Sequence, residues 1–135
     1  MARIVLDTFA PYAYFAGESA AVEVQSLLRG AREGEHELSM AMFNVGELVY
    51  KLWRSLGEED ASDALFILER WPVQIVESDR DLILHAAAIK AQRRMGYLDC
   101  FPAALAMRQN AAVATGDTGF KAVEDMVAIH WLPRL

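Results

Sequence analysis

The chain has 135 residues, of which 54% are hydrophobic, a net charge of −6 and a single cysteine. This length suits one domain, residues 1–135, around one core, and the charge argues against a protein that coats nucleic acid without specificity. One cysteine excludes an internal disulfide, and no uncharged apolar run approaches the ~18 residues that a membrane span needs. The start, MARIVLD, lacks the features of a signal peptide, so we expect a cytoplasmic protein with no membrane segment.

Short apolar runs alternate with stretches of helical periodicity along the whole chain. The first run, residues 3–6, is rich in β-branched side chains and ends at Asp7, as expected of a buried central strand. Strands that alternate with helices predict an α/β fold with a parallel sheet, helices on both faces and right-handed crossovers. Further strands are expected at residues 36–40, 73–76, 112–115 and 127–131.

The helices of the first half of the chain are delimited by glycines and by capping residues. A short apolar helix is expected over residues 10–16, and Ser19 is placed to cap the next helix, with Val22 on its apolar face. Residues 44–56 repeat apolar side chains at helical spacing. Three consecutive acids then open another helix, which stops near Trp71.

Two helices are expected in the second half. Ser78 and Asp81 resemble a capping box with aspartate in place of glutamate, and they start a helix that runs to about Arg94. A further helix begins near Asp99. It accommodates Pro102 only in its first turn, where a missing N–H costs nothing.

Four acidic residues stand at places that suit a binding site. Asp99 lies at a helix N-terminus, while Asp7 and Asp117 follow strands, and ligands bind at the carboxyl ends of the strands in an open parallel sheet. Glu47 interrupts the apolar face of its helix, where a carboxylate is costly unless it is paired or binds a cation. Asn44, one turn earlier on the same face, is placed to hold that carboxylate or a water.

Each acid also has a purely structural explanation. A charge after a buried strand, such as Asp7, is often a turn residue, and Glu47 can pair with Lys51 four residues on. Oxygen ligands from four distant segments nevertheless suit a hard divalent cation, Mg²⁺ or Mn²⁺, which polarises a phosphodiester and activates a water for in-line attack. The histidines lack the spacing of zinc ligands, Cys100 has no evident histidine partner, and no glycine-rich phosphate loop is present.

Four motifs, in this order and spacing, resemble the PIN domains of VapC-type toxins from prokaryotic toxin–antitoxin pairs. They are IVLDT at 4–8, NVGEL at 44–48, LDCFPAALA at 98–106 and VATGDTGF at 113–120. The resemblance covers almost the full chain and implies a three-layer α/β/α sandwich around a parallel sheet. It also implies a Mg²⁺- or Mn²⁺-dependent endoribonuclease that cuts RNA and is bound by a small antitoxin of the VapB type. The site residues implied are the acids Asp7, Glu47, Asp99 and Asp117, with Thr8 and Thr115 as supporting residues.

Three positions depart from the pattern of this family. Phe9 replaces the small polar residue that often follows Asp-Thr, and residues 96–98 are Gly-Tyr-Leu where Ser-x-Ala is common. Gly119 stands where many relatives carry an additional acid. These departures concern the groups around the acids and any second metal position, and none of the four principal acids is lost.

Basic residues lie close in sequence to the acids. They are expected to form a rim that grips phosphates, although scattered lysines and arginines are equally typical of a solvated face. Tyr97 is placed to stack on an unpaired base, with core packing as the alternative. The basic residues are Lys51, Arg54, Arg93, Arg94 and Lys121.

Two other classes of function fit parts of this pattern. A PIN fold that binds RNA or protein without cutting would keep the same architecture, and metal-dependent cleavage that is lost on Asp99→Asn separates it from an enzyme. An aspartyl-phosphate phosphatase built on Asp7 would need a second acid two residues on, where Phe9 stands instead.

The hydrophobic content exceeds what one small core readily hides, which indicates an interface. We expect the region of residues 42–71 to form a homodimer contact or the groove for an antitoxin helix. The alternative is that its aromatic side chains simply fill the core. The large side chains concerned are Met42, Tyr50, Trp53, Phe66 and Trp71.

Overall fold

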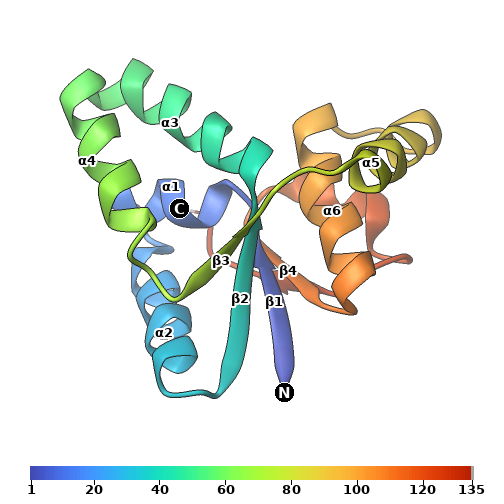
Figure 1. The fold of residues 1–135 in the computed structure, drawn as a ribbon, viewed down its shortest axis with the longest axis horizontal. Helices are drawn as coiled ribbons and strands as arrows, with labels where there is room; N and C mark the ends of the chain where they lie inside the picture. The colour runs from blue at the N-terminus through green and yellow to red at the C-terminus, as the bar shows by residue number, and fades with distance from the viewer. Residues whose placement is uncertain (135) are drawn as a thin grey trace.

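The computed structural model describes residues 1–134, which form an α/β fold around a five-stranded sheet (Figure 1). All neighbouring strands are parallel, in the order β3-β2-β1-β4-β5. The chain therefore adds β2 and β3 on one side of β1, and then returns to add β4 and β5 on the other. The strands are β1 (Ala2–Leu6), β2 (His36–Ala41), β3 (Val73–Val76), β4 (Ala112–Thr115) and β5 (Ile129–Trp131).

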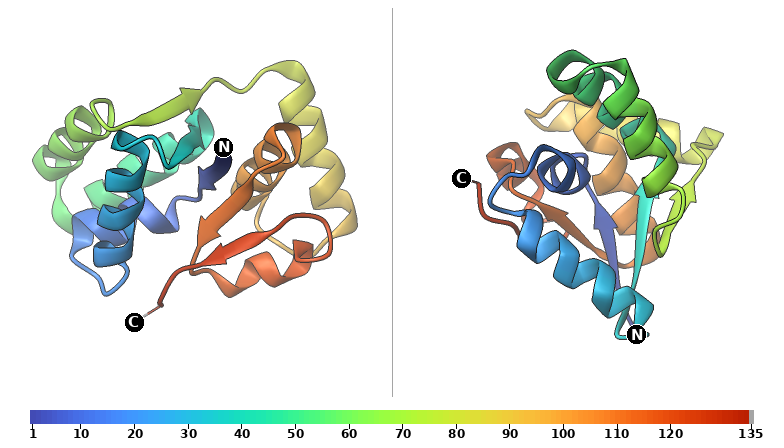
Figure 2. Two further views of the ribbon diagram at one scale, coloured as in Figure 1. Left: turned by 90° about the horizontal axis from the view of Figure 1, so that it is seen from below. Right: turned by 90° about the vertical axis from the view of Figure 1, so that its left-hand side faces the viewer.

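Helices cover both faces of the sheet, which confirms the predicted three-layer sandwich (Figures 1 and 2). One layer consists of α1 (Phe9–Ala16), α2 (Ala21–Arg32), α3 (Met42–Leu56) and α4 (Glu58–Leu68). The other consists of α5 (Arg80–Gln92), α6 (Tyr97–Gln109) and the 3₁₀ helix η1 (Thr118–Val123). Within residues 1–134, none of these helices has the length and apolar character to cross a bilayer.

The core is divided in two by the sheet, as alternation along the strands requires. Ile4 and Leu6 of β1 pack toward the layer of α1 to α4, while Val5 between them packs toward α5 and α6. Phe101 of α6 and Phe120 of η1 are the largest fully buried side chains, and both belong to the second half of the core. Because β1 is buried on both faces, the residue that follows it is held in a fixed position.

The predicted starts of α2 and α5 are wrong in detail. Helix α2 begins after Ala20 with no side-chain cap from Ser19, and Val22 is 75% exposed rather than packed inward. Helix α5 is capped by Asp79, whose Oδ1 accepts a hydrogen bond from the Leu82 N–H at 2.8 Å, and not by a box of Ser78 with Asp81.

Trp71 was expected at a surface, and the structure places it in the core. Its side chain is 8% exposed and stacks in parallel on Phe15 of α1, with ring centroids 5.2 Å apart. Tyr14 meets the same indole edge-on at 5.0 Å. Trp71 therefore fixes the end of α4 against α1, and the alternative of core filling is correct for this residue.

Candidate active site

The four acids are brought to the carboxyl edge of the sheet by its topology. β1 lies where the order of strand addition reverses, which is the place where ligands bind in open parallel sheets. Asp7 directly follows β1, and Asp117 follows β4, its neighbour. Helix α3, which carries Glu47, starts directly after β2, and Asp99 lies in the first turn of α6. A single cavity at this edge is lined by all four acids.

Three of the four carboxylates form a tight cluster. Asp7, Glu47 and Asp99 each offer one carboxylate oxygen, and these oxygens all lie within 4.8 Å of one another. Asp117 lies outside this triad but lines the same cavity, and its charge raises the pKa of Asp99. The three acids of the triad come from segments far apart in the sequence, so only the folded chain brings them together.

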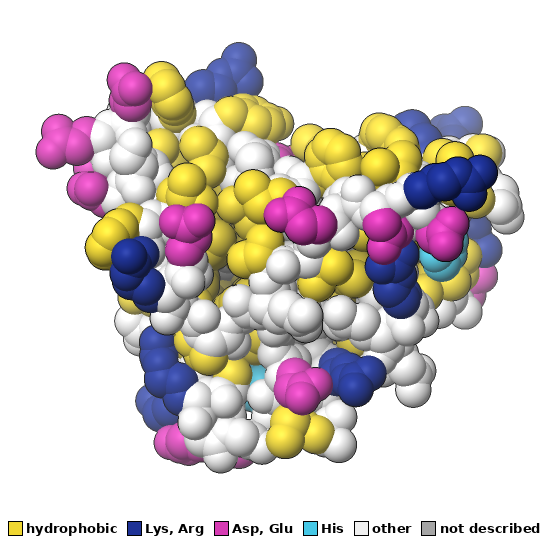
Figure 3. Space-filling view, viewed as in Figure 1, with side chains coloured by type: hydrophobic (Ala, Val, Ile, Leu, Met, Phe, Trp, Pro, Cys, Tyr) yellow, Lys and Arg dark blue, Asp and Glu magenta, His cyan; other side chains and the backbone are white. Residues whose placement is uncertain are grey.

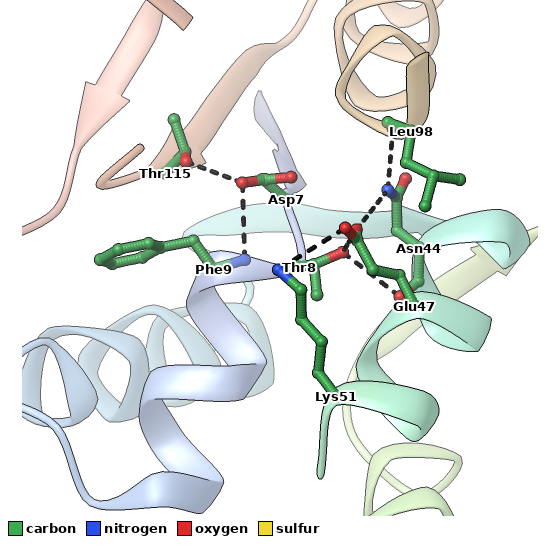
Figure 4. Close-up of polar contacts among 8 residues, drawn as sticks. All are labelled: Asp7, Thr8, Phe9, Asn44, Glu47, Lys51, Leu98 and Thr115. Atoms are coloured by element: carbon green, nitrogen blue, oxygen red, sulfur yellow. Dashed lines mark hydrogen bonds and ion pairs between the residues drawn. The ribbon is translucent and has the colours of Figure 1, made fainter. Parts of the chain in front are cut away.

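Thr115 lies beside Asp7 (Figure 4) and connects it to Asp117. Its hydroxyl donates to Asp7 Oδ2 at 2.8 Å and accepts the N–H of Asp117 at 3.0 Å. The N–H of Phe9 also points to Asp7 Oδ2, at 3.5 Å, whereas Asp7 Oδ1 is buried and has no hydrogen-bond partner within residues 1–134. One oxygen of this carboxylate is thus held in place, and the other is left for a ligand.

Glu47 is held by residues of two different helices. The Thr8 hydroxyl at the start of α1 donates to Glu47 Oε1, and Lys51 Nζ lies 3.6 Å from Oε2. The predicted i+4 pair is therefore present, yet Glu47 is only 8% exposed and also faces the other acids, so the pairing and the site role do not exclude each other.

Pro102 was predicted in the first turn of its helix, and this is wrong. Helix α6 starts at Tyr97, so Pro102 is the sixth residue and lies inside the helix. Proline has no N–H, so the carbonyl of Leu98, four residues earlier, has no donor within the helix. Asn44 of α3 supplies one, since its Nδ2 lies 3.0 Å from Leu98 O.

Burial and mutual repulsion raise the pKa values of two acids. The pKa of Asp7 rises to about 7, first because it is desolvated and then because of the charge of Asp99, although the hydrogen bond from Thr115 opposes this. The pKa of Asp99 rises to about 6, again through desolvation and then through the charges of Asp117 and Glu47. Acids in such a cluster ionise together most readily when a cation lies between them.

The donor set fits a hard divalent cation. Only oxygen atoms converge here, from carboxylates, and Mg²⁺ and Mn²⁺ prefer such ligands. The buried oxygen of Asp7 without a partner is the kind of group that a bound ion satisfies. Asp7, Glu47 and Asp99 are thus the residues suited to hold the ion, with Asp117 beside them.

The departures at Phe9 and Gly119 are accommodated without change to the acids. The Phe9 ring points away from the cluster (Figure 4) and lies over Gly116, where an added Cβ would come within 2.3 Å of the ring. The N–H of Gly119 donates to Asp117 Oδ1 at 2.8 Å, so this position closes a turn around Asp117. A phenylalanine at position 9 is therefore matched by a glycine at position 116.

Of the predicted basic rim, Lys51 alone lines the cavity. Arg93 is engaged elsewhere, because its guanidinium makes two hydrogen bonds to the Asp125 carboxylate, at 2.6 and 3.0 Å. Arg54, Arg94 and Lys121 do not line the cavity.

Sequence reasoning missed Arg134, an exposed residue that lines the cavity together with the acids. It follows β5, whose ladder with β4 continues through the hydrogen bond from the Leu132 N–H to Thr115 O at 2.9 Å. The available signal was the strand itself, because a parallel strand beside β4 delivers its next residues to the same edge.

Comparison with known proteins identifies the family and the fold. The sequence model of the PIN domain matches residues 4–126, and no curated protein sequence matches the chain. VapC20 of Mycobacterium tuberculosis, described as a sarcin-ricin loop cleaving toxin, superposes with a TM-score of 0.77 at 18% identity, covering 96% of this chain and 99% of that one.

Two complexes give similar values. VapBC2 of Rickettsia felis, bound to a DNA fragment from its promoter, has a TM-score of 0.76 at 15% identity and covers 97% of this chain and 99% of that one. DNA-bound VapBC of Salmonella typhimurium has a TM-score of 0.74 at 18% identity, covering 96% and 98%. At such identities the likeness concerns the fold, whereas the match of the sequence model spans most of the chain. The chain belongs to the PIN domain family.

Proposed function

We propose that this single domain is a metal-dependent endoribonuclease of the VapC type, the toxin of a type II toxin–antitoxin pair. The observation that carries the proposal is the convergence of Asp7, Glu47 and Asp99 within 4.8 Å at the switch point of the sheet. The similar structures support it, since their descriptions include a toxin that cleaves the sarcin-ricin loop and VapBC complexes. Metal-dependent hydrolysis of RNA is the activity that such a cluster suits best.

Each residue has a defined task in this proposal. Mg²⁺ or Mn²⁺, held by the triad, supplies polarisation of the phosphodiester and activation of water. Asp7 keeps one carboxylate oxygen fixed by Thr115 and directs the other into the cluster. Thr8 fixes the orientation of Glu47.

The substrate phosphates need positive charge at the rim of an acidic cavity, and two cations line it. Lys51 is engaged with Glu47, whereas Arg134 makes no ion pair with an acid of residues 1–134. We therefore assign to Arg134 the contact with a substrate phosphate.

Arg134→Ala should raise KM with little change in kcat. Arg29→Ala on α2 is the control, and an unchanged KM for Arg134→Ala would remove this assignment.

The products of cleavage test the chemistry. Attack of water on phosphorus leaves a 5′-phosphate and a 3′-hydroxyl, whereas attack by the RNA 2′-hydroxyl leaves a 2′,3′-cyclic phosphate. We expect 5′-phosphate ends, mapped by ligation-based sequencing of RNA from arrested bacterial cells, and no cleavage in EDTA. Cyclic ends, or cleavage that persists in EDTA, would contradict the mechanism even if RNA is cut.

The alternative is a PIN domain that binds RNA or protein without cutting. It predicts that the purified chain binds RNA but yields no new ends with Mg²⁺ or Mn²⁺. If the wild type cleaves RNA and Asp99→Asn does not, the protein is an enzyme and the alternative is excluded.

The surface over α3 and α4 is proposed as the contact for the antitoxin or for a second copy of the chain. Figure 3 shows hydrophobic side chains gathered there, and Tyr50, Trp53 and Phe66 are 43%, 50% and 58% exposed. Such an apolar face suits an amphipathic helix. Trp71 is excluded from this surface because it lies in the core.

Trp53→Ala and Phe66→Ser are expected to weaken antitoxin binding or self-association at least about tenfold, because each removes a large apolar contact. Sedimentation measures self-association, and calorimetry measures antitoxin binding. Leu84→Ser, at an exposed position of α5, serves as the control. If both variants associate as the wild type does, the interface lies elsewhere.

A further inference from the structure

A proline inside α6 leaves one backbone group of that helix without its usual partner. Pro102 is the sixth residue of α6, and the carbonyl four residues before it belongs to Leu98, directly next to Asp99. The ring of an internal proline also pushes the carbonyl four residues back away from the helix axis. The Leu98 carbonyl therefore lacks its helical donor, at the end of the helix that carries an acid of the triad.

The Asn44 amide occupies the space between this carbonyl and Glu47. Its Nδ2 lies 3.0 Å from Leu98 O and 3.4 Å from Glu47 Oε1, so both of its N–H groups face an acceptor (Figure 4). A carbonyl oxygen and a carboxylate oxygen accept hydrogen bonds, so this orientation of the amide suits both neighbours. Asn44 is fully buried, and water does not compete for its donors.

The aromatic contact between α3 and α6 is less directional. Phe43 of α3 packs on Phe101 of α6 with ring centroids 4.5 Å apart and an interplanar angle of 41°, a contact that tolerates small shifts. The two hydrogen bonds of Asn44 do not, because their geometry is restricted. They join Leu98, the residue before Asp99, to Glu47, so they connect two members of the acidic triad.

We propose that Asn44 and Pro102 act as one positioning device, which sets the separation of the Glu47 and Asp99 carboxylates for metal binding. Pro102 makes the Leu98 carbonyl available, and Asn44 uses it to hold α6 at a fixed distance from α3. Neither residue lines the cavity, so both act through the acids rather than on the metal or the substrate. The inference rests on the proposed metal-dependent function.

Pro102→Ala is the most informative variant. The alanine of this variant has an N–H that can close the helical hydrogen bond to Leu98, which draws the carbonyl back toward the helix and weakens its hydrogen bond with Asn44. We expect the affinity for Mn²⁺, measured by calorimetry, to fall about tenfold, as is typical when a residue that orients metal ligands is changed. The fold should persist by circular dichroism.

Asn44→Ala should likewise weaken Mn²⁺ binding about tenfold or more, and it should lower Tm because it leaves the carbonyl of the half-buried Leu98 without its donor. In the Pro102→Ala background, Asn44→Ala should lower the Mn²⁺ affinity and Tm by less, because the hydrogen bond between Asn44 and Leu98 is already weakened. Ser39→Ala is the matched control. It removes another part-buried hydrogen bond, from Ser39 to Gln109 at 2.8 Å, and should lower Tm without changing Mn²⁺ affinity.

The outcomes separate the two claims. If the wild type binds no Mn²⁺, the proposed function fails, and the positioning role falls with it even if Tm still couples the two residues. If the wild type binds Mn²⁺ and Pro102→Ala binds it equally well, the positioning role is wrong while the function stands. Additive effects of Asn44→Ala and Pro102→Ala on Mn²⁺ affinity would also overturn it.

Discussion

Replacing Asp7 by asparagine is expected to lower metal-dependent RNA cleavage by about 10³-fold or more, since a bound metal contributes several kcal/mol of charge stabilisation. The asparagine carbonyl can still accept the hydrogen bond from Thr115. The NH₂ group of the asparagine then takes the place of the buried Oδ1 of Asp7, and an NH₂ group cannot bind a cation. The metal-free variant should also have a higher Tm than the metal-free wild type, because one charge of a repelling cluster is gone.

Activity assays and thermal unfolding with EDTA measure the two effects. Asp63→Asn, an exposed acid of α4, is the control and should change neither. Calorimetric titration of Mn²⁺ into Asp117→Asn completes the series, because Asp117 stands beside the triad rather than in it. Cleavage by Asp7→Asn within tenfold of the wild type would refute the role of Asp7, and unchanged Mn²⁺ affinity in Asp117→Asn would remove that residue from the ligands.

The stability of the metal-free protein should fall as the pH rises from 5 to 8. The pKa of Asp7 is about 7 in the folded chain against an ordinary value of 3.8, so between these values the folded state holds a proton that the unfolded state has lost. Stability from this group is therefore greatest at low pH and is lost as the pH rises toward 7. With the pKa of Asp99 at about 6, the loss is on the order of 2 kcal/mol or more.

Urea unfolding at pH 5, 6, 7 and 8 with EDTA measures this slope. Mn²⁺ should reverse it, because a metal binds the ionised carboxylates and its affinity rises over the same interval. Asp7→Asn should flatten the profile of the metal-free protein. A wild type that is equally stable at pH 5 and pH 8 without metal would show that burial and mutual repulsion do not raise the pKa values of Asp7 and Asp99.

The order of strands and helices follows from the sequence because each element carries its own periodicity. The run at residues 3–6 predicted a central strand, and the layer arrangement follows from the alternation of strands and helices. The errors fall where an outcome depends on a distant segment. Trp71 is buried because Phe15 offers a face to stack on, and nothing within residues 58–71 indicates that partner.

In the site, too, local patterns predicted some features, while others depend on distant segments. The four acids were recognisable because they stand at the ends of elements or interrupt an apolar face. That Asp7, Glu47 and Asp99 form the tight triad while Asp117 stands aside depends on how distant segments meet in the folded chain, which no local pattern gives. The use of Asn44 depends on the start of α6, two residues earlier than expected, which turned Pro102 from a harmless first-turn residue into an internal one.

The place of β4 beside the central strand β1 has a consequence for the way the protein is made. β4 completes the hydrogen bonding of β1 and carries Thr115, the donor that fixes Asp7, yet it is synthesised after more than three quarters of the chain. A nascent chain that ends before residue 112 has β1 with an open edge and lacks both Thr115 and Asp117. Parallel pairing between segments so far apart in sequence is also slow to form. The acidic site therefore closes late, when translation of the domain is nearly finished, and the growing polypeptide carries no complete site while most of it is being made.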